Sequence, residues 1–416
     1  MEEPRIVILG GGFGGVRCAL DIEKGLRGKA RITLIDKNNY HFFTPALYEV
    51  ASAYQMGEDP YRMRLRKAIA ISYGDIFGDR QVDIIQAEIA SVDIERKHVS
   101  IDGGQELDFD YLLFALGSQT ADFGIPGVNE YAYQFKTTDD AIALNQKLDS
   151  LFSEVSTGMG QMPMKLLVIG AGFAGIELAA ELVTCARKLC IRYKLDKRAF
   201  SVILFEAAPT ILPMVNESER KKIMDRLTEL GVVIMANSTI ESVQSDLVKL
   251  KNGQTMNGSA VIWTAGVQAN KLAATIHGLP VTARGKVTVD QYLRATGMPN
   301  IFALGDVAEF IDPKTQKPIP GLAHLAQAQG SLIARNLAAT IHGGKLKEYK
   351  PDYSSWVAPV GGKFAVAHVG NIFTASGILG WLVRNLVDLR YFLSILSVSK
   401  ALKLFTKDVM IFSRND

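Results

Sequence analysis

Two stretches of the chain share one pattern of apolar and polar positions. Residues 5–36 and residues 165–206 each begin with an apolar run, pass through a glycine-rich turn and a helical pattern, and end in a second apolar run closed by an acid. This order predicts a β-strand, a tight turn, an α-helix and a second, parallel β-strand. The repetition of the unit predicts two dinucleotide-binding folds in one chain.

Each stretch has a later partner. Residues 111–117 and residues 261–266 are apolar runs that end in a small residue and a glycine, as a strand needs when its end passes close to a bound nucleotide. Residues 118–129 contain Gly124, Pro126 and Gly127 and read as a linker. A second crossover is expected between Gly266 and Val287, so the second unit is inserted into the first.

The predicted fold class is therefore α/β. It has two Rossmann-like dinucleotide-binding domains, one inserted in the other, and a C-terminal α+β module with amphipathic helices. We place the first domain in two parts, residues 1–125 and 287–345, the second domain at residues 126–286, and the C-terminal module at residues 346–416.

Composition narrows the function classes. The 416 residues are 48% hydrophobic and 21% charged, which supports a large buried core and several domains. A net charge of +3 gives no general argument for nucleic-acid binding. Three cysteines (Cys18, Cys185 and Cys190) indicate a reducing compartment rather than a disulfide framework. The start of the chain resembles no secretory signal, and no Cys/His spacing predicts a metal site.

The first glycine motif carries the signs of a nucleotide-binding turn. Gly10 makes the turn, Gly12 lets the backbone approach a pyrophosphate, and Gly15 lets the helix and strand pack closely. The start of the following helix offers free N–H groups and the positive end of a dipole. Asp36 stands 21 residues after Gly15, where a carboxylate can accept a hydrogen bond from a ribose hydroxyl.

The second glycine motif, at Gly170, Gly172 and Gly175, repeats this arrangement. Its acid, Glu206, comes 31 residues after Gly175, so the intervening helix must be longer and is expected to run through Lys194. A carboxylate at this place accepts hydrogen bonds from free ribose hydroxyls and repels a 2′-phosphate. The second domain is therefore expected to bind NADH in preference to NADPH.

A third motif indicates a flavin. The apolar run of residues 301–304 ends in Gly305 and Asp306. The glycine permits a close approach, and the carboxylate can bind a polyol hydroxyl such as those of the ribityl chain. With this motif the chain resembles the flavoprotein reductases that have two dinucleotide-binding domains.

Within that superfamily the resemblance narrows to the type II NADH:quinone oxidoreductases, single-subunit respiratory enzymes that pump no ions. Residues 39–51, 170–182, 261–267 and 299–308 carry it. It implies FAD, NADH and a quinone acceptor, with the protein attached peripherally to the cytoplasmic side of a membrane. The FAD contacts that it implies are Gly10, Gly12, Phe13, Gly14, Gly15, Asp36, Lys37, Ile89, Ala115, Gly117, Gly305, Asp306, Ala323 and His324; the NADH contacts are Gly170, Gly172, Phe173, Ala174, Gly175, Glu206, Ala265 and Gly266.

Two residues are candidate proton donors for the quinone. Members of the family usually have two glutamines at a helix start that faces the flavin, and here His324 and Ala328 stand in those places, with Gln327 and Gln329 on either side of the second. We expect His324 to be mostly neutral at a helix start, and a simple hydrogen-bonding spacer is the alternative to a proton donor there. The resemblance implies that Glu177 reaches the flavin and assists quinone reduction; an acid that complements the helix dipole is the simpler interpretation.

Cys185 and Cys190 have the spacing of a flavin-linked disulfide, but they lie in the wrong domain for one. On one helix, residues five apart also point about 140° apart. We therefore predict no redox role for them, and their scarcity argues against a sulfide oxidase. Two other functions stay open: a soluble NADH reductase for a protein acceptor such as a ferredoxin, and a slow redox-sensing flavoprotein.

The tail is the predicted membrane contact. Residues 356–373 read as strands and residues 378–407 as an amphipathic helix, whose charges leave apolar runs too short to span a bilayer. Such a helix suits the membrane interface, and a dimerisation helix is the alternative. The expected contacts are Trp381 and Tyr391 with headgroups, Lys400, Lys403 and Lys407 with anionic lipid, and the apolar face of Leu382, Leu386, Leu389, Leu393 and Leu396.

Two further expectations concern the tail. The uncharged stretch at residues 364–383 is long enough to span a bilayer, but its glycines and strand-like pattern argue against that. Removal of residues 378–416 is expected to solubilise the protein and to leave the reduction of flavin by NADH nearly intact, because both dinucleotide-binding units are complete before them.

Overall fold

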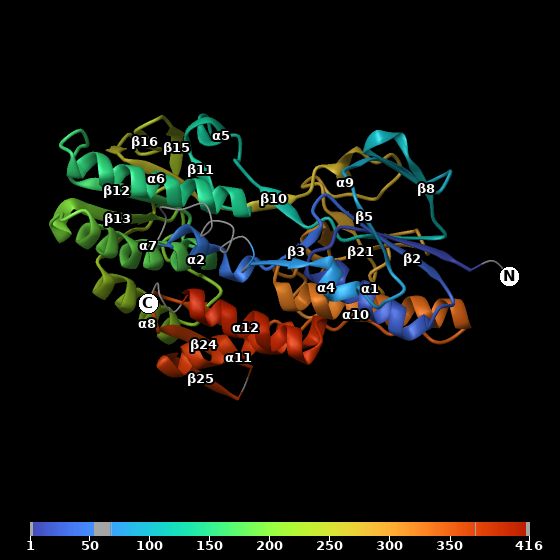
Figure 1. The fold of residues 1–416 in the computed structure, drawn as a ribbon. Coiled ribbons are helices and arrows are strands. Elements are labelled where there is room, and N and C mark those ends of the chain that lie inside the picture. Colours follow the sequence, from blue (N-terminus) through green and yellow to red (C-terminus); the bar gives the residue numbers. More distant parts are fainter. Residues whose placement is uncertain (1–2, 54–66, 68, 371, 413–416) are drawn as a thin grey trace.

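The computed structural model describes residues 3–53, 67, 69–370 and 372–412, and Figure 1 shows their arrangement. The first of two five-stranded sheets is entirely parallel, in the order β21-β9-β1-β2-β5. Its strands are β1 (Arg5–Leu9), β2 (Arg31–Asp36), β5 (Asp83–Gln86), β9 (Tyr111–Phe114) and β21 (Ile301–Ala303).

The second sheet repeats this parallel design in the order β11-β18-β12-β13-β14. All of its strands lie within residues 126–286. They are β11 (Tyr133–Gln134), β12 (Met164–Ile169), β13 (Phe200–Phe205), β14 (Val232–Met235) and β18 (Ala260–Trp263).

The chain order shows that the second unit is inserted into the first, because β21 joins the first sheet only after the second sheet is complete. The two connections run side by side: β10 (Ser118–Thr120) on the way in pairs antiparallel with β19 (Val267–Ala269) on the way out. The insertion therefore enters and leaves through one two-stranded ribbon, between the two halves of the molecule (Figure 1).

Each sheet has helices against it. In the first unit α1 (Phe13–Leu26) and α10 (Ala323–His342) pack together so closely that a Cβ on Gly330 would lie 2.5 Å from the Gly14 carbonyl oxygen. In the second, α7 (Phe173–Arg192) has 20 residues against 14 in α1, and this longer helix together with a longer connection to β13 accounts for the late position of Glu206. It ends at Arg192, so Lys194 lies outside the helix that was expected to include it. Also here are α6 (Thr138–Ser156) and α8 (Glu217–Leu230).

Smaller elements complete both units. The antiparallel pieces are β3 (Tyr40–Phe42) with β4 (Ala70–Ser72), β6 (Ile89–Asp93) with β7 (His98–Ile101) and β8 (Glu106–Asp108), and β15 (Ile240–Val243) with β16 (Leu247–Leu250) and β17 (Thr255–Asn257). A short parallel pair joins β20 (Val287–Thr288) and β22 (Ala308–Glu309). The short helices are α2 (Leu47–Ala51), α4 (Tyr73–Phe77), α5 (Val128–Tyr131) and α9 (Leu272–Thr275).

The C-terminal module touches both dinucleotide-binding units. It has an antiparallel sheet of β23 (Trp356–Pro359), β24 (Ala365–Val369) and β25 (Phe373–Gly377), followed by α11 (Ile378–Ile395) and α12 (Val398–Phe412). The predicted strands of residues 356–373 thus extend four residues further. The two helices lie along one side of the molecule (Figure 1), where α11 is linked to α2 by the ion pair of Arg384 with Glu49 and α12 is linked to α4 by that of Lys400 with Asp75.

The orientation of α11 corrects the sequence prediction. Arg384 and Asp388 point into the protein, where Arg384 pairs with Glu49 at 2.5 Å and with Asp388 at 3.1 Å. Tyr391, expected near lipid headgroups, is 7% exposed. The helical pattern of the sequence was interpreted with Arg384 and Asp388 exposed to water. In the folded protein these two side chains form ion pairs in the interior. Within the described ranges of the chain, none of the helices combines the length and the hydrophobicity that a bilayer span requires.

Candidate active site

The first glycine loop joins β1 to α1 and has room for a ligand at one position. Gly10 has a φ of +104°, and a Cβ there would lie 2.5 Å from the carbonyl oxygen of Ala115. A Cβ on Gly15 would lie 1.9 Å from the Gly10 carbonyl oxygen. Around Gly12, by contrast, no described atom lies within 4 Å of the Cβ position. Gly10 and Gly15 are thus fixed by the fold, and Gly12 faces open space at the start of a helix.

Asp36 fastens this loop to the end of β2. One carboxylate oxygen accepts a hydrogen bond from the Gly11 N–H at 2.6 Å, and the other accepts from the Asn38 N–H at 2.8 Å. The carboxylate therefore has a fixed orientation beside the glycine loop. It remains partly exposed, so it is accessible to a ribose hydroxyl.

The second glycine loop has the same geometry. Gly170 has a φ of +105°, and a Cβ on Gly175 would lie 1.9 Å from the Gly170 carbonyl oxygen, while the space beside Gly172 is open. Glu206 accepts hydrogen bonds from the N–H groups of Ala171 and Ala208, both at 2.9 Å. The two acids thus hold their loops in equivalent ways, which supports the repeat inferred from the sequence.

Asp306 lies at the meeting point of the two units. It accepts a hydrogen bond from the Ser118 hydroxyl at 2.6 Å, and Lys136 donates to the same hydroxyl at 2.9 Å. Burial lowers the pKa of Lys136, and the nearby charge of Asp306 partly offsets this. The side chain of Gln329 accepts from the Gly305 N–H at 2.7 Å and so fixes the turn. Sequence reasoning missed Lys136 and Ser118, which no motif marks.

The remaining predicted contacts are distributed around these two loops. Phe13 and Phe173 begin the two helices, and each packs against an aromatic ring of the C-terminal module. Gly266 lies beneath the ring of Phe123, an exposed residue with a φ of +52°. The others are placed as follows: Gly14 packs against α10, Ala115, Gly117 and Ala265 follow their strands, Lys37 is exposed next to Asp36, Ile89 begins β6, Ala174 is exposed in the first turn of α7, and Ala323 begins α10.

His324 lies in the first turn of α10 and faces the chain that leads into the C-terminal module. Its Nε2 is 3.2 Å from the carbonyl oxygen of Asp352, so Nε2 carries the proton and donates it. The residue is exposed, but neighbouring protein still lowers its pKa by partial desolvation. The direction agrees with the neutral ring expected from the sequence, although the main cause is burial rather than the helix dipole.

Glu177 belongs to an acidic cluster, which we define as Glu49, Glu177, Glu181 and Asp388. Arg384 pairs with Glu49 and Asp388 and interacts electrostatically with Glu177, so it links α2, α7 and α11. Burial raises the pKa of Glu177 to about 8; Arg384 opposes this rise, whereas Asp388 and Glu49 add to it. The pKa of Asp388 is raised by its burial too, although Arg384 lowers it. Glu177 therefore holds a proton at neutral pH inside the protein.

A partial signal for this cluster was present in the sequence. Charged residues inside the apolar pattern of α11 marked Asp388 and its partner Arg384, but nothing local indicated that Glu49 lies opposite them. All three cysteines are buried and free. In the described part of the chain no group of His, Cys, Asp or Glu side chains is arranged to hold a metal ion.

Two parallel sheets, each with a glycine loop and a carboxylate anchored beside it, define an oxidoreductase with two dinucleotide-binding domains. The family model described as pyridine nucleotide-disulphide oxidoreductase matches residues 4–330. The chain belongs to this family.

Individual relatives agree with this assignment. A type II NADH:quinone oxidoreductase from Staphylococcus aureus (strain NCTC 8325 / PS 47) is 28% identical over 355 residues, which cover 84% of this chain and 85% of that protein. The structure of NDH2 from Plasmodium falciparum in complex with NADH has a TM-score of 0.85 at 19% identity, with 98% of each chain covered. The sulfide:quinone oxidoreductase from Aquifex aeolicus has a TM-score of 0.76 at 20% identity, over 98% of this chain and 92% of that one.

Proposed function

We propose that this protein is an FAD-dependent NADH:quinone oxidoreductase that works at a membrane surface. The observation that carries the proposal is Glu177, a half-buried carboxyl just beyond the second glycine loop, whose pKa is raised to about 8 by desolvation. It lies against α11, whose outer face is apolar. An electron-transfer protein that reduces a lipid-soluble quinone needs such a proton source next to a lipid-facing surface. The relatives named type II NADH:quinone oxidoreductases support the same conclusion.

The first glycine loop suits FAD. Its open side at Gly12 admits a pyrophosphate, Asp36 is held in place for a ribose, and Asp306 can bind the ribityl chain. The second loop suits NADH through Gly172 and Glu206. When FAD is bound, its ring supplies the redox chemistry, accepting a hydride from the nicotinamide and passing two electrons to the quinone. The chain's own residues position the two nucleotides and supply protons.

Glu177 is the residue that we assign to proton supply. At neutral pH it is protonated, so it can donate to a quinone oxygen that acquires negative charge. Arg384 lies within the same cluster and can help to compensate the charge that remains on Glu177. His324 is the second candidate, but it is neutral and its Nε2 proton is already directed to Asp352.

The membrane contact that we propose is the outer face of α11 with the adjoining chain. Arg384 and Asp388 of α11 point inward and Arg390 is exposed, and the other exposed side chains of this helix are mainly apolar, which is the arrangement expected at a lipid surface. Lys400 is paired with Asp75 at 3.0 Å rather than free for lipid. We place this face on the cytoplasmic side of the membrane. Its exposed residues include Ile372, Phe373, Ile378, Leu379, Leu382, Leu386, Val387 and Leu393.

The apolar face can be tested with charges. Leu379→Asp combined with Leu386→Asp is expected to lower binding to vesicles by at least about tenfold, because each change replaces an exposed leucine of the proposed lipid contact with a charged side chain. Bound FAD should be unchanged. Ile191→Asp is the matched control, since Ile191 is 80% exposed at the far end of α7. Full vesicle binding by the double variant would contradict the proposal; a dimer that becomes monomeric instead would identify this face as a homodimer interface.

Glu206 and Asp36, the two acids beside the glycine loops, are expected to affect different nucleotides. Glu206→Ala is expected to weaken NADH binding by about 1–3 kcal/mol, because a charge-assisted hydrogen bond to the ribose is lost, and to reduce the preference for NADH over NADPH. Asp36→Ala should instead weaken FAD retention and leave NADH binding intact. Nucleotide titrations of both variants give the comparison. If Glu206→Ala left the NADH/NADPH ratio of kcat/KM unchanged, the carboxylate would not be reading the ribose.

The direct test of the activity is to follow the flavin absorbance while NADH, and then a quinone, are added without oxygen. It separates the proposed enzyme from a reductase for a protein acceptor and from a slow redox sensor.

A further inference from the structure

His41, in β3, connects the first glycine loop with the C-terminal helix α11. It is completely buried. Its Nδ1 lies 3.0 Å from the carbonyl oxygen of Gly11, and its Nε2 lies 2.6 Å from the hydroxyl oxygen of Tyr391. One imidazole ring therefore makes hydrogen bonds to two segments 380 residues apart in the chain.

The directions of these hydrogen bonds follow from the partners. A carbonyl oxygen can only accept, so the Nδ1 of His41 carries the proton and donates it to Gly11. The Nε2 atom is then an acceptor, and the hydroxyl of Tyr391 donates to it. Burial lowers the pKa of His41 to about 4, which keeps the ring neutral and this single arrangement in place.

The peptide group of Gly11 is thereby held from both sides. Its N–H donates to Asp36, and its carbonyl oxygen accepts from His41 and from the Tyr73 hydroxyl at 3.1 Å. Aromatic side chains pack around the hydrogen bond between His41 and Tyr391. The ring of Phe13 lies edge-on to that of His41 with their centroids 4.9 Å apart, and the ring of Phe43 stacks on that of Tyr391 with a centroid distance of 5.6 Å. Tyr391 is thus a buried part of the wall behind the loop.

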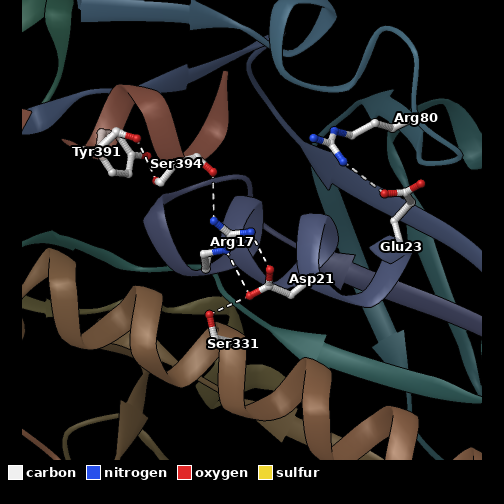
Figure 2. A network of polar contacts seen from close by, with 7 residues as sticks. All are labelled: Arg17, Asp21, Glu23, Arg80, Ser331, Tyr391 and Ser394. Carbon is white, nitrogen blue, oxygen red and sulfur yellow. Dashed lines mark hydrogen bonds and ion pairs between the residues drawn. The ribbon is translucent and has the colours of Figure 1, made fainter. Parts of the chain in front are cut away.

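A second connection fixes α11 next to α1. Figure 2 shows Arg17, on α1, donating to the backbone carbonyl oxygen of Ser394 at 2.9 Å, on the same helix as Tyr391. Arg17 also pairs with Asp21, and Asp21 accepts a hydrogen bond from Ser331 of α10 at 2.6 Å. The helix that follows the glycine loop is therefore tied to α11 and α10 at once.

We propose that Tyr391 and His41 are positioning residues of the FAD site, so that docking of α11 and binding of FAD stabilise each other. The inference rests on FAD occupying the first glycine loop, as proposed above, and not on the nature of the electron acceptor. It replaces the sequence-based expectation that removing residues 378–416 leaves flavin reduction nearly intact. Because coupling of this kind is reciprocal, FAD should also stabilise the docked tail.

Tyr391→Phe tests the link with little loss of packing, since only the hydroxyl is removed. We expect the affinity of the flavin-free protein for FAD to fall by about three- to tenfold, the effect of one lost buried hydrogen bond. Tyr349→Phe is the matched control. Tyr349 is also buried, but its hydroxyl has no hydrogen-bond partner among the described residues, so FAD affinity should be unchanged. NADH binding by the second loop reports correct folding in every variant.

A double-mutant cycle shows whether the effect passes through the histidine. In a His41→Leu background, Tyr391→Phe should cause no further loss of FAD affinity, because the link is already broken. Truncation before residue 378 should lower FAD affinity at least as much as Tyr391→Phe does. FAD affinity equal to that of the wild type in Tyr391→Phe or in the truncated protein would overturn the proposal. So would an undiminished effect of Tyr391→Phe in the His41→Leu background.

Discussion

Gly15→Ala is expected to yield a protein without FAD. The added Cβ would lie 1.9 Å from the carbonyl oxygen of Gly10, which is backbone and has no flexible end to move. The loop and the start of α1 must separate, at a cost of about 3 kcal/mol or more, at the upper end of overpacking effects. Thermal unfolding of the flavin-free protein should show the loss of stability, and absorbance should show the absence of flavin.

Gly12→Ala separates the role of the ligand from that of the fold. No described atom lies within 4 Å of its Cβ position, and its φ of −72° suits any residue. The flavin-free protein should therefore unfold at the wild-type temperature but bind FAD weakly, because the methyl group occupies the space where the pyrophosphate approaches. Normal FAD affinity in Gly12→Ala would show that no pyrophosphate binds at this loop.

Glu177→Gln is expected to slow quinone reduction by about 10²–10⁴-fold, the usual contribution of a general acid. The amide has the shape of the carboxyl group but cannot deliver a proton. Flavin reduction by NADH should be nearly unchanged, since hydride transfer needs no acid. Glu181→Gln is the matched control: Glu181 lies one turn further along α7 and is buried, and an amide oxygen can still accept from the Gly362 N–H.

The same carboxyl predicts a pH dependence. The pKa of Glu177 is raised to about 8, so the proton is present below that pH and lost above it. Quinone reduction by the wild-type protein should therefore decrease as the pH rises through about 8, and this decrease should be missing from Glu177→Gln. If the rate of quinone reduction by the wild-type protein did not change between about pH 6 and about pH 9, a range that includes the pKa of Glu177, Glu177 would be excluded as the donor.

The features that the sequence predicted well are local ones. The two glycine loops, the strands before them and the acids after them lie within short segments, and their spacing reflects the geometry of one βαβ unit. The insertion of one unit in the other could be predicted because each loop needs a later partner strand. The Gly305–Asp306 motif was recognisable for the same reason, as the end of an apolar strand.

The features that sequence analysis missed depend on contacts between residues that are far apart in the sequence. Arg384 is 335 residues from Glu49, and Tyr391 is 350 residues from His41. A helical pattern shows which residues share a face, but not whether that face meets lipid or a buried acid. Arg384 and Asp388 were therefore assigned to the wrong environment: they lie inside the protein, and the apolar side of α11 is exposed. Lys136 was missed because it comes close to Asp306 and Ser118 only in the folded protein, where the connection between the two units brings these segments together.

The most direct test of the proposed function is a two-step stopped-flow experiment on the full-length protein without oxygen. One equivalent of NADH should bleach the flavin rapidly, and a water-soluble quinone analogue mixed in afterwards should restore its absorbance in a second, separately timed step. Reduction by NADH followed by slow or absent recovery with quinone would contradict the account. Rapid recovery with ferredoxin alone would identify a protein acceptor, and a flavin that stays reduced with both would identify a redox sensor.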